Sequence, residues 1–370
     1  MWRRERKQGI GKRQPCGEEF FDFRCEYTTL CCGISDSISA RSIVNPGSGN
    51  MTANLPSAVI ATAIDSSYAL PLAVMLRSAL GNLDLEVAIA AHIVDDGLSL
   101  AERDKVEASL PGRVLLHWVR RSREQFEGLP NWGRVSLTTY HKLTLGEWLP
   151  SRVERVIWLD ADMLVLGNLA RLWQANLGGH LALAAQDILV PFVSSRFGIA
   201  AYRELGLKRQ ARYFNAGVML IDVARWRRDE VTARAFDYLR RYGERVFFLD
   251  QEALNVVLAG QWETLDPRWN WNPVIDRLSI YKRERARDEI TGDPWIIHFV
   301  GNLKPWTYLG PSRHQTLYYQ WLDQTAWRGW RPERSWRAWF FAAYESSPLR
   351  AWLYPVEQLH LRLVKWMTRR

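Results

Sequence analysis

The chain has 370 residues, of which 47% are hydrophobic and 24% are charged, and its formal net charge is +9. These values are ordinary for a globular protein and leave room for one large domain or two. No apolar run approaches the roughly 18 residues that a membrane-spanning helix requires, and polar residues interrupt any signal-peptide core near the N-terminus. We therefore expect a cytoplasmic protein.

The N-terminal segment differs from the rest of the sequence. All the cysteines lie there, so we expect neither a disulfide framework nor a Cys-rich metal site in the main body: Cys16, Cys25, Cys31 and Cys32. The first fifty residues lack sustained periodicity and end in a loop-like stretch just before Met51. We predict a disordered extension over residues 1–55, and residues 1–50 could equally be an upstream translation artefact. A family-specific extension with its own role is the alternative.

The positive charge is concentrated at the C-terminal end. Residues 327–370 carry nine Lys or Arg and three Glu, whereas residues 51–326 are close to neutral. The basic isoelectric point therefore belongs mainly to the tail, and nucleic acid is not expected as a partner.

From residue 57 onward, strand-like and helix-like segments alternate, which is typical of α/β architecture. The strand patterns cover 58–64, 86–94, 113–119, a run ending at Asp160, 181–186, 214–221 and 295–299. The helix patterns cover 68–80, 100–110, 139–148, 231–242 and 251–259. After Trp306, seven of the 19 tryptophans fall between Trp321 and Trp366. We therefore predict an α/β domain over 56–310 and a Trp/Arg-rich helical segment over 311–370.

Asp160 and Asp162 follow the apolar run 156–159, which predicts a buried strand that brings two carboxylates to the ligand-binding edge of the sheet. Paired carboxylates there suit a hard divalent cation, and such a cation suits a diphosphate. For an isolated Asp-x-Asp, carboxylates that cap backbone amides are an equally good explanation. A phosphatase of the haloacid-dehalogenase type also has a strand followed by Asp-x-Asp, but it expects Thr or Val where this chain has Leu164.

A second motif offers further ligands. His298 lies near the end of the last predicted strand, and Gly301 and Lys304 follow it. Glycine lets the backbone approach phosphate oxygens, and lysine supplies a positive charge to them. Asp, Asp and His form a mixed oxygen and nitrogen set that suits Mn²⁺, with Mg²⁺ also possible. A lone histidine at a strand end is, however, more often a packed residue than a ligand.

Six motifs occur in the same order as in one known family. They are Ala63-Ile-Asp65-Ser-Ser-Tyr68, Thr138-Thr-Tyr140-His-Lys142-Leu-Thr-Leu-Gly146-Glu147, Val156-Ile-Trp-Leu-Asp160-Ala-Asp162, Tyr213-Phe-Asn215-Ala-Gly217-Val-Met-Leu, Asp250-Gln251-Glu252-Ala-Leu-Asn255 and His298-Phe-Val-Gly301-Asn-Leu-Lys304-Pro-Trp306. With these motifs the chain resembles the family 8 glycosyltransferases, which include bacterial lipopolysaccharide galactosyl- and glucosyltransferases and glycogenin. The resemblance implies a GT-A fold, in which a mixed, mostly parallel sheet is flanked by helices.

The resemblance also implies roles for individual residues. It assigns Asp160, Asp162 and His298 to Mn²⁺, which binds the diphosphate of a UDP-hexose donor. The residues that it implies for the rest of the nucleotide are Asp65 at the uridine, Tyr68 stacked on uracil, and Lys142, Gly301 and Lys304 at the phosphates. The residues that it places around the sugar are Asp187, Asn215, Asp250 and Gln251, with Gln251 near the anomeric carbon.

Three of these sugar-pocket residues have an ordinary structural explanation as well. Asn215 could form a strand-edge turn, and Asp250 and Gln251 could begin a helix. The chain also departs from many relatives at Lys142, where they have arginine, so the charge is kept but the bidentate fork is lost. A Ser66-Ser67 pair stands where close bacterial relatives have Asp-Asn, at the implied contacts to the base and ribose.

The implied reaction moves glucose or galactose from a UDP-sugar to a glycan or lipid-linked acceptor with retention, which gives an α-linkage. Because the amide of Gln251 is a poor nucleophile, we favour a same-face substitution in which the leaving phosphate oxygen helps to deprotonate the acceptor hydroxyl. A catalytically inactive sugar-nucleotide or carbohydrate-binding protein of the same fold is the alternative.

The C-terminal tail carries an amphipathic pattern. Its apolar residues fall on one helical face beside basic residues: Val356, Leu359, Leu363 and Trp366. This pattern predicts a peripheral anchor on an anionic membrane surface at the cytoplasmic face. A helical cap packed on the catalytic domain is the alternative.

Overall fold

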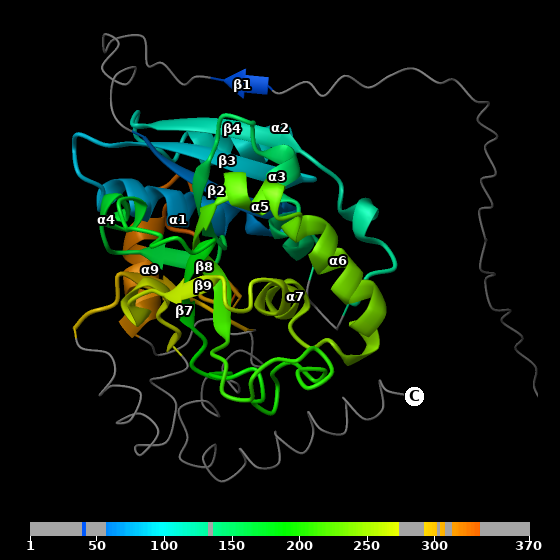
Figure 1. The fold of residues 1–370 in the computed structure, drawn as a ribbon. Helices are drawn as coiled ribbons and strands as arrows, with labels where there is room; N and C mark the ends of the chain where they lie inside the picture. The colour runs from blue at the N-terminus through cyan, green and yellow to red at the C-terminus, as the bar shows by residue number, and fades with distance from the viewer. Residues whose placement is uncertain are drawn as a thin grey trace, which may run out of the picture. The chain divides into compact units, whose positions relative to one another are not determined.

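The computed structural model describes residues 39–41, 57–131, 136–273, 292–301, 304–307 and 313–333. In these ranges the main sheet has eight strands in the order β1-β4-β3-β2-β5-β8-β7-β9 (Figure 1). The strands are β1 (Ser39–Arg41), β2 (Ser57–Asp65), β3 (Ala88–Asp96), β4 (Val114–Arg120), β5 (Arg155–Leu159), β7 (Ala182–Gln186), β8 (Phe214–Asp222) and β9 (Trp262–Thr264). A second sheet pairs β6 (Met163–Val165) with β10 (Ile296–His298).

The main sheet is mixed and mostly parallel, as the sequence predicts. Strands β4, β3, β2 and β5 form consecutive parallel pairs, and β9 is parallel to β7. Strand β8 runs antiparallel to both β5 and β7, and β1 runs antiparallel to β4. Because β2, β3 and β5 are parallel, their carboxyl ends meet at one edge of the sheet. Asp65 and Asp96, the last residues of β2 and β3, are register partners there.

Each face of the sheet has its own apolar core, because alternate strand residues point in opposite directions. In β5, Ile157 and Leu159 face one core, whereas Val156 and Trp158 face the other. The first core is covered by helices α1 (Ala69–Gly81), α2 (Leu100–Glu107) and α4 (Leu169–Trp173). The second is covered by α3 (Leu145–Trp148), α5 (Val223–Arg228), α6 (Val231–Tyr242) and α7 (Leu249–Val257) (Figure 1).

The predicted helix over 139–148 is wrong. The chain forms a 3₁₀ segment, η3 (Leu137–Lys142), followed by the short helix α3. The carbonyl of His141 accepts hydrogen bonds from the Thr144 hydroxyl at 3.1 Å and the Trp148 indole at 3.0 Å. Side-chain bonds to this carbonyl compete with a continuous helical ladder, so the helix is interrupted.

The described part of the C-terminal segment packs on the domain. Helix α9 (Arg313–Leu322) shares an apolar cluster with α1, β6 and β10. Trp321 lies so close to Gly81 that a Cβ there would be 2.5 Å from Trp321 Cζ3. Lys105 Nζ lies 4.6 Å from the centre of the Trp327 ring. The described residues from Arg313 to Trp327 therefore contact the folded body.

Two sequence predictions fall largely outside the described residues. These are the extension over 1–55, apart from β1, and the amphipathic pattern between Val356 and Trp366. Within the described ranges, no helix combines the length and the apolar character that crossing a membrane would require.

Candidate active site

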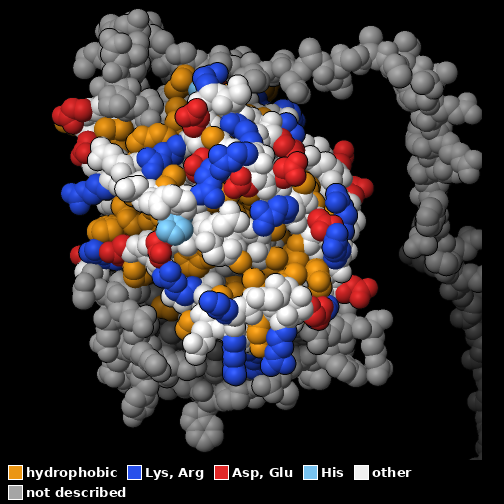
Figure 2. All heavy atoms as spheres, in the orientation of Figure 1, with side chains coloured by type: hydrophobic (Ala, Val, Ile, Leu, Met, Phe, Trp, Pro, Cys, Tyr) orange, Lys and Arg blue, Asp and Glu red, His pale blue; other side chains and the backbone are white. Residues whose placement is uncertain are grey.

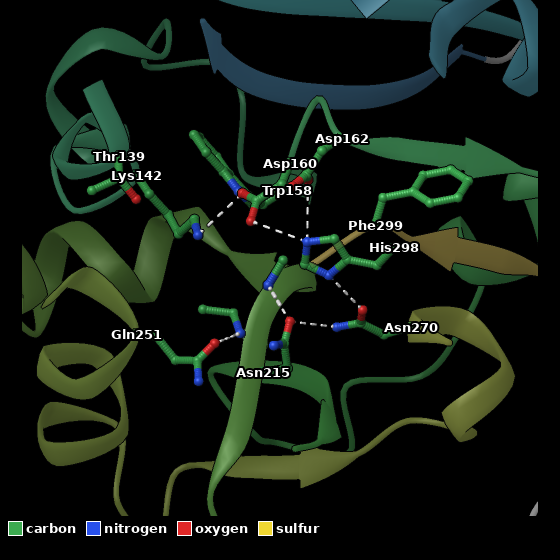
Figure 3. Close-up of polar contacts among 12 residues, drawn as sticks. Thr139, Lys142, Trp158, Asp160, Asp162, Asn215, Gln251, Asn270, His298 and Phe299 are labelled. Atoms are coloured by element: carbon green, nitrogen blue, oxygen red, sulfur yellow. Dashed lines mark hydrogen bonds and ion pairs between the residues drawn. The ribbon is translucent and has the colours of Figure 1, made fainter. Parts of the chain in front are cut away.

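Asp160, Asp162 and His298 come together where the two sheets meet. The carboxylates lie in the loop between β5 and β6, and His298 is the last residue of β10, which pairs antiparallel with β6. The amide of Phe299 donates to the carbonyl of Asp162 at 3.0 Å and holds the two loops together. Strand pairing thus joins residues that are far apart in the sequence (Figure 3).

The three side chains point their inner polar atoms at one another. One ligand atom from each lies within 4.8 Å of the other two. Nε2 of His298 is 3.1 Å from Asp162 Oδ1 and 3.9 Å from Asp160 Oδ2. The outer oxygens face lysines: Lys142 Nζ is 3.2 Å from Asp160 Oδ1, and Lys304 Nζ bonds Asp162 Oδ2.

The two carboxylates differ in their electrostatics. Burial raises the pKa of Asp160, and the charge of Asp162 adds to that rise while Lys142 opposes it. Burial alone would also raise the pKa of Asp162, but the adjacent Lys304 ammonium opposes burial and holds this pKa well below its usual range. Asp162 is therefore the more firmly ionised member of the pair.

The cluster has the properties of a cation site. Asp162 Oδ1 is buried and has no hydrogen-bond partner among the residues that the structure describes. A buried carboxylate oxygen without a partner is unfavourable unless something else binds it. Two carboxylate oxygens and an imidazole nitrogen match the preference of Mn²⁺, and Mg²⁺ accepts the same oxygens.

His298 is held by residues that the sequence does not single out as ligands. Its Nδ1 lies 2.9 Å from Oδ1 of Asn270. Gly217 lies under the imidazole, where a Cβ would be 2.7 Å from His298 Nδ1 and 2.9 Å from the methyl carbon of Met163. Gly217 belongs to a family motif, but no sequence signal identifies Asn270, because it lies outside the six motifs.

Asp187, Asn215 and Gln251 form a second polar group beside the cluster. Asp187 Oδ2 accepts from the amides of Asn215 at 3.1 Å and Gln251 at 3.2 Å. Its Oδ1 accepts from the backbone amides of Leu189 at 2.8 Å and Val190 at 2.9 Å, which fixes the carboxylate at the end of β7. These hydrogen bonds hold three of the four predicted sugar-pocket residues together.

Asp250 is joined to the cation cluster through Lys142. The Lys142 ammonium lies 2.8 Å from Asp250 Oδ2, and Asp250 Oδ1 accepts from the Thr139 hydroxyl at 2.8 Å. Burial alone would lower the pKa of Lys142, but Asp160 and Asp250 raise it above its usual value. Lys142 is almost fully buried between these carboxylates, so the structure gives it partners other than the diphosphate that the resemblance implies.

The start of α7 orients Asp250 and Gln251. Leu249 has a positive φ of 42°, which a branched side chain rarely adopts. The fully buried carboxylate of Glu252 accepts from the amide of Phe247 at 2.7 Å and from the hydroxyl of Tyr238 at 2.8 Å. These bonds stabilise the strained turn that points Gln251 toward Asp187.

The predicted nucleotide residues lie at the carboxyl end of β2 and in the loop after β10. Asp65 caps the 3₁₀ turn η1 (Ser66–Tyr68), and its Oδ1 accepts from the amide of Ser67 at 3.1 Å. Tyr68 packs edge-on against Trp306, with ring centres 5.8 Å apart. Burial and the charges of Asp162 and Asp65 raise the pKa of Tyr68 above its usual value. Gly301 has a φ of 84°, so this turn favours glycine.

The comparison with known proteins agrees with this geometry. The sequence model of the family described as "Glycosyl transferase family 8" matches residues 59–310. The chain belongs to glycosyl transferase family 8.

Relatives in this family are similar over most of their length. General stress protein A of Bacillus subtilis is 25% identical over 276 residues, which cover 72% of this chain and 94% of that protein. The lipopolysaccharide 1,2-glucosyltransferase of Escherichia coli is 25% identical over 67% of this chain and 72% of its own. Among solved structures, the galactosyltransferase LgtC, in complex with donor and acceptor sugar analogues, is 27% identical, with a TM-score of 0.63 over 74% of this chain and 98% of its own.

Membership of family 8 confirms the α/β class and the GT-A fold, and it identifies the chain as a glycosyltransferase. It excludes the phosphatase that the Asp-x-Asp motif also allowed. The structure brings Asp160, Asp162, His298 and Lys304 into one cluster and links Lys142, Asp187, Asn215, Asp250 and Gln251 beside it.

Proposed function

We propose that this family 8 enzyme transfers a hexose from a UDP-sugar to a saccharide or glycolipid acceptor, with Mn²⁺ at Asp160, Asp162 and His298. The observation that carries the proposal is the convergence of three ligand atoms around the buried, unpartnered Asp162 Oδ1. When bound, a divalent cation supplies a Lewis acid that neutralises the charge of a leaving diphosphate. Mg²⁺ is the second candidate cation.

The protein's own residues would bind and orient the rest of the donor. Asp65 would bond the uridine, and Tyr68 would stack on uracil. Lys304 would hold the phosphates together with the backbone at Gly301, because its ammonium already lies against the cation cluster. Lys142 would not contact the donor directly. Its ammonium would keep the carboxylates of Asp160 and Asp250 ionised and hold them in position.

The sugar would occupy the side of the cluster that carries Asp187, Asn215, Asp250 and Gln251. We propose that the reaction retains the anomeric configuration and gives an α-linkage. The anomeric carbon–oxygen bond would break, the leaving phosphate oxygen would take the proton of the acceptor hydroxyl, and the acceptor oxygen would bond the same face. Gln251 would orient the sugar rather than attack it, since both ends of its amide are already engaged with Asp187 and the amide of Ala216.

The donor is best identified by a screen that needs no acceptor. UDP-glucose and UDP-galactose are incubated with the protein and Mn²⁺, and the released UDP is measured. Water replaces the acceptor slowly in such reactions, so we expect UDP release from one of these donors above the background of a protein-free control. UDP binding without release from any UDP-hexose would favour the inactive, ligand-binding alternative.

A lipopolysaccharide-like or other lipid-linked acceptor is the proposed acceptor class. It rests on the names of relatives such as the lipopolysaccharide 1,3-galactosyltransferase of Salmonella typhimurium, which is 22% identical over 72% of this chain and 78% of its own. On the upper part of the face shown in Figure 2, basic and acidic side chains are interspersed.

Peripheral attachment to an anionic membrane at the cytoplasmic face is proposed for the basic tail. Because α9 packs on α1 and Trp327 lies against Lys105 of α2, the truncation keeps these residues and ends after Glu333. We expect the full chain to co-sediment with anionic liposomes at low salt and the truncated chain to remain in the supernatant. Equal sedimentation of both would contradict the anchor.

A further inference from the structure

Asn270 ends the 3₁₀ turn η5 (Pro267–Asn270), between β9 and β10, and its side chain bridges two groups of the active site. Its Nδ2 donates to Asn215 Oδ1 at 2.9 Å, and its Oδ1 lies 2.9 Å from His298 Nδ1 (Figure 3). It thus connects the sugar pocket with the cation cluster, although it belongs to neither set predicted from the sequence.

A backbone amide sets the direction of this bridge. The N–H of Gly217 can only donate, and it does so to Asn215 at 3.0 Å, so the acceptor atom must be the Asn215 carbonyl oxygen. The same oxygen is hydrogen-bonded to the side chain of Asn270. Because a carbonyl oxygen can only accept, the group of Asn270 that contacts it must be the NH₂ group. The opposite end of Asn270 is then its carbonyl oxygen, and this oxygen faces His298.

From this chain of hydrogen bonds we infer that Asn270 is a positioning residue, which accepts from Nδ1–H of His298 and so leaves Nε2, on the side of the carboxylates, as the nitrogen that binds a cation. An amide oxygen accepts but cannot donate, so the imidazole nitrogen against it must carry a proton. The other nitrogen, Nε2, lies 3.1 Å from Asp162 Oδ1. That carboxylate oxygen is also an acceptor and competes for the last proton of the ring, so the tautomer at alkaline pH decides between Asn270 and Asp162. The inference rests on the proposed function, in which Nε2 binds a divalent cation.

The hydrogen bond between Asn215 and Asp187 fixes the orientation of the Asn215 amide. Asn215 uses its NH₂ group on Asp187, a carboxylate that can only accept when ionised. Asn215 therefore lies between a backbone N–H, which can only donate, and an ionised carboxylate, which can only accept. Neither of these two hydrogen bonds can change its direction. Flipping the amide of Asn270 would place oxygen against oxygen at Asn215 and NH₂ against N–H at His298.

Gly217 completes the arrangement. It supplies the amide that sets the direction, and the absence of its Cβ leaves room for the imidazole ring. The ring is therefore fixed both in position and in the identity of its protonated nitrogen. Outer-shell partners of this kind typically change metal affinity by roughly 10- to 100-fold when removed.

The test uses Asn270→Leu, which keeps approximate size but removes the acceptor, and Asn270→Asp, which keeps an acceptor. Asn176→Leu is the matched control, since Asn176 is exposed and bonds only a nearby loop amide among the described residues. Mn²⁺ affinity is measured by electron paramagnetic resonance, and thermal unfolding checks the fold. The tautomer is read from long-range ¹H–¹⁵N spectra at alkaline pH, with the His298 signal assigned by its loss in His298→Gln.

We expect His298 to carry its proton on Nδ1 in the wild type, in Asn270→Asp and in the control. In Asn270→Leu the signal should change to the Nε2–H form, with Mn²⁺ affinity lower by roughly 10- to 100-fold. An unchanged tautomer and unchanged affinity in folded Asn270→Leu would overturn the inference. If Asn270→Leu does not fold, the wild type is sufficient as a test, because an Nε2–H signal from its His298 would also overturn the inference.

The two readouts separate this inference from the proposed function. The tautomer of His298 is measured without metal, so the result tests the role of Asn270 whether or not the protein binds Mn²⁺. A wild type that binds no Mn²⁺ but carries Nδ1–H would contradict the cation site and leave the role of Asn270 intact.

Discussion

At the scale of single residues, the active site is a set of charges that hold one another in place. Lys142 and Lys304 each neutralise the outer oxygen of one aspartate, and the inner oxygens and His298 Nε2 are left facing one another. Repulsion between the two neighbouring carboxylates is tolerated because each has its own ammonium partner. The site is therefore preorganised to receive a cation.

Asp162→Asn tests the more firmly ionised ligand. The amide keeps the size of the carboxylate but loses its charge, so Mn²⁺-dependent UDP release should fall by more than the roughly 100-fold that an outer-shell change gives. Asp237→Asn, on the exposed surface of α6, is the matched control and should keep wild-type turnover. Near-normal activity of Asp162→Asn at limiting Mn²⁺ would show that the metal assignment is wrong.

Gly217→Ala tests the space under the imidazole. A methyl group there would displace His298, so we expect Mn²⁺ affinity to drop by at least about 10-fold with the fold retained. Gly112→Ala is the control, because nothing lies within 4 Å of a Cβ at that position. Titration with Mn²⁺ measures both variants; equal affinities would show that the ring tolerates the displacement.

At the scale of elements, the site depends on short pieces that a sequence pattern predicts poorly. The long strands and the helix over 231–242 were predicted because their apolar residues repeat regularly. Strand β6, with three residues, was missed, although its pairing with β10 is what brings His298 to the aspartates. The motifs identify the ligands, but only this register shows how they meet.

Two other features of the site could not be predicted, for related reasons. The partners of Lys142 depend on the turn at Leu249, which places Asp250 beside the ammonium. The role of Asn270 depends on a hydrogen-bond chain through three segments of the sequence. Such contacts arise from tertiary packing, which periodicity and motif spacing do not report.

Arg227 on α5 shows how an element is fixed by one side chain. Its guanidinium donates to five backbone carbonyls at the end of α3 and beyond, which belong to Gly146, Leu149, Pro150, Ser151 and Val153. Arg227→Met leaves these carbonyls without their donor, so the free energy of unfolding should fall by about 2 kcal/mol. Arg228→Met, next to it and exposed, should change it by less than about 0.5 kcal/mol. Urea unfolding compares the two, and equal losses would contradict the role.

At the scale of the whole molecule, the two cores bury several histidines as neutral groups. His92 and His117 stack on neighbouring strands with ring centres 4.5 Å apart. Burial, the neighbouring His117 and Arg152 lower the pKa of His92 from 6.5 to about 4. Burial also lowers the pKa of His141 to about 4. Protonation of these rings therefore favours the unfolded chain.

The stability of the fold should depend on pH in a defined window. Above about pH 6.5, His92 is neutral in both states and has no effect; as the pH falls toward 4, the unfolded chain binds the proton first and becomes favoured. The difference in pKa corresponds to about 3 kcal/mol lost over this window. We expect His92→Gln to show a smaller decrease in unfolding free energy between these pH values than the wild type. Parallel pH profiles would contradict this.

The central claim is that the cation cluster and the nucleotide residues form one donor site. Equilibrium binding of UDP, measured by calorimetry with Mn²⁺ and with excess chelator, tests it most directly. We expect Mn²⁺ to tighten UDP binding at least about 10-fold, since the metal joins Asp160, Asp162 and His298 to the diphosphate. UDP affinity that is the same with Mn²⁺ and with chelator would contradict the claim.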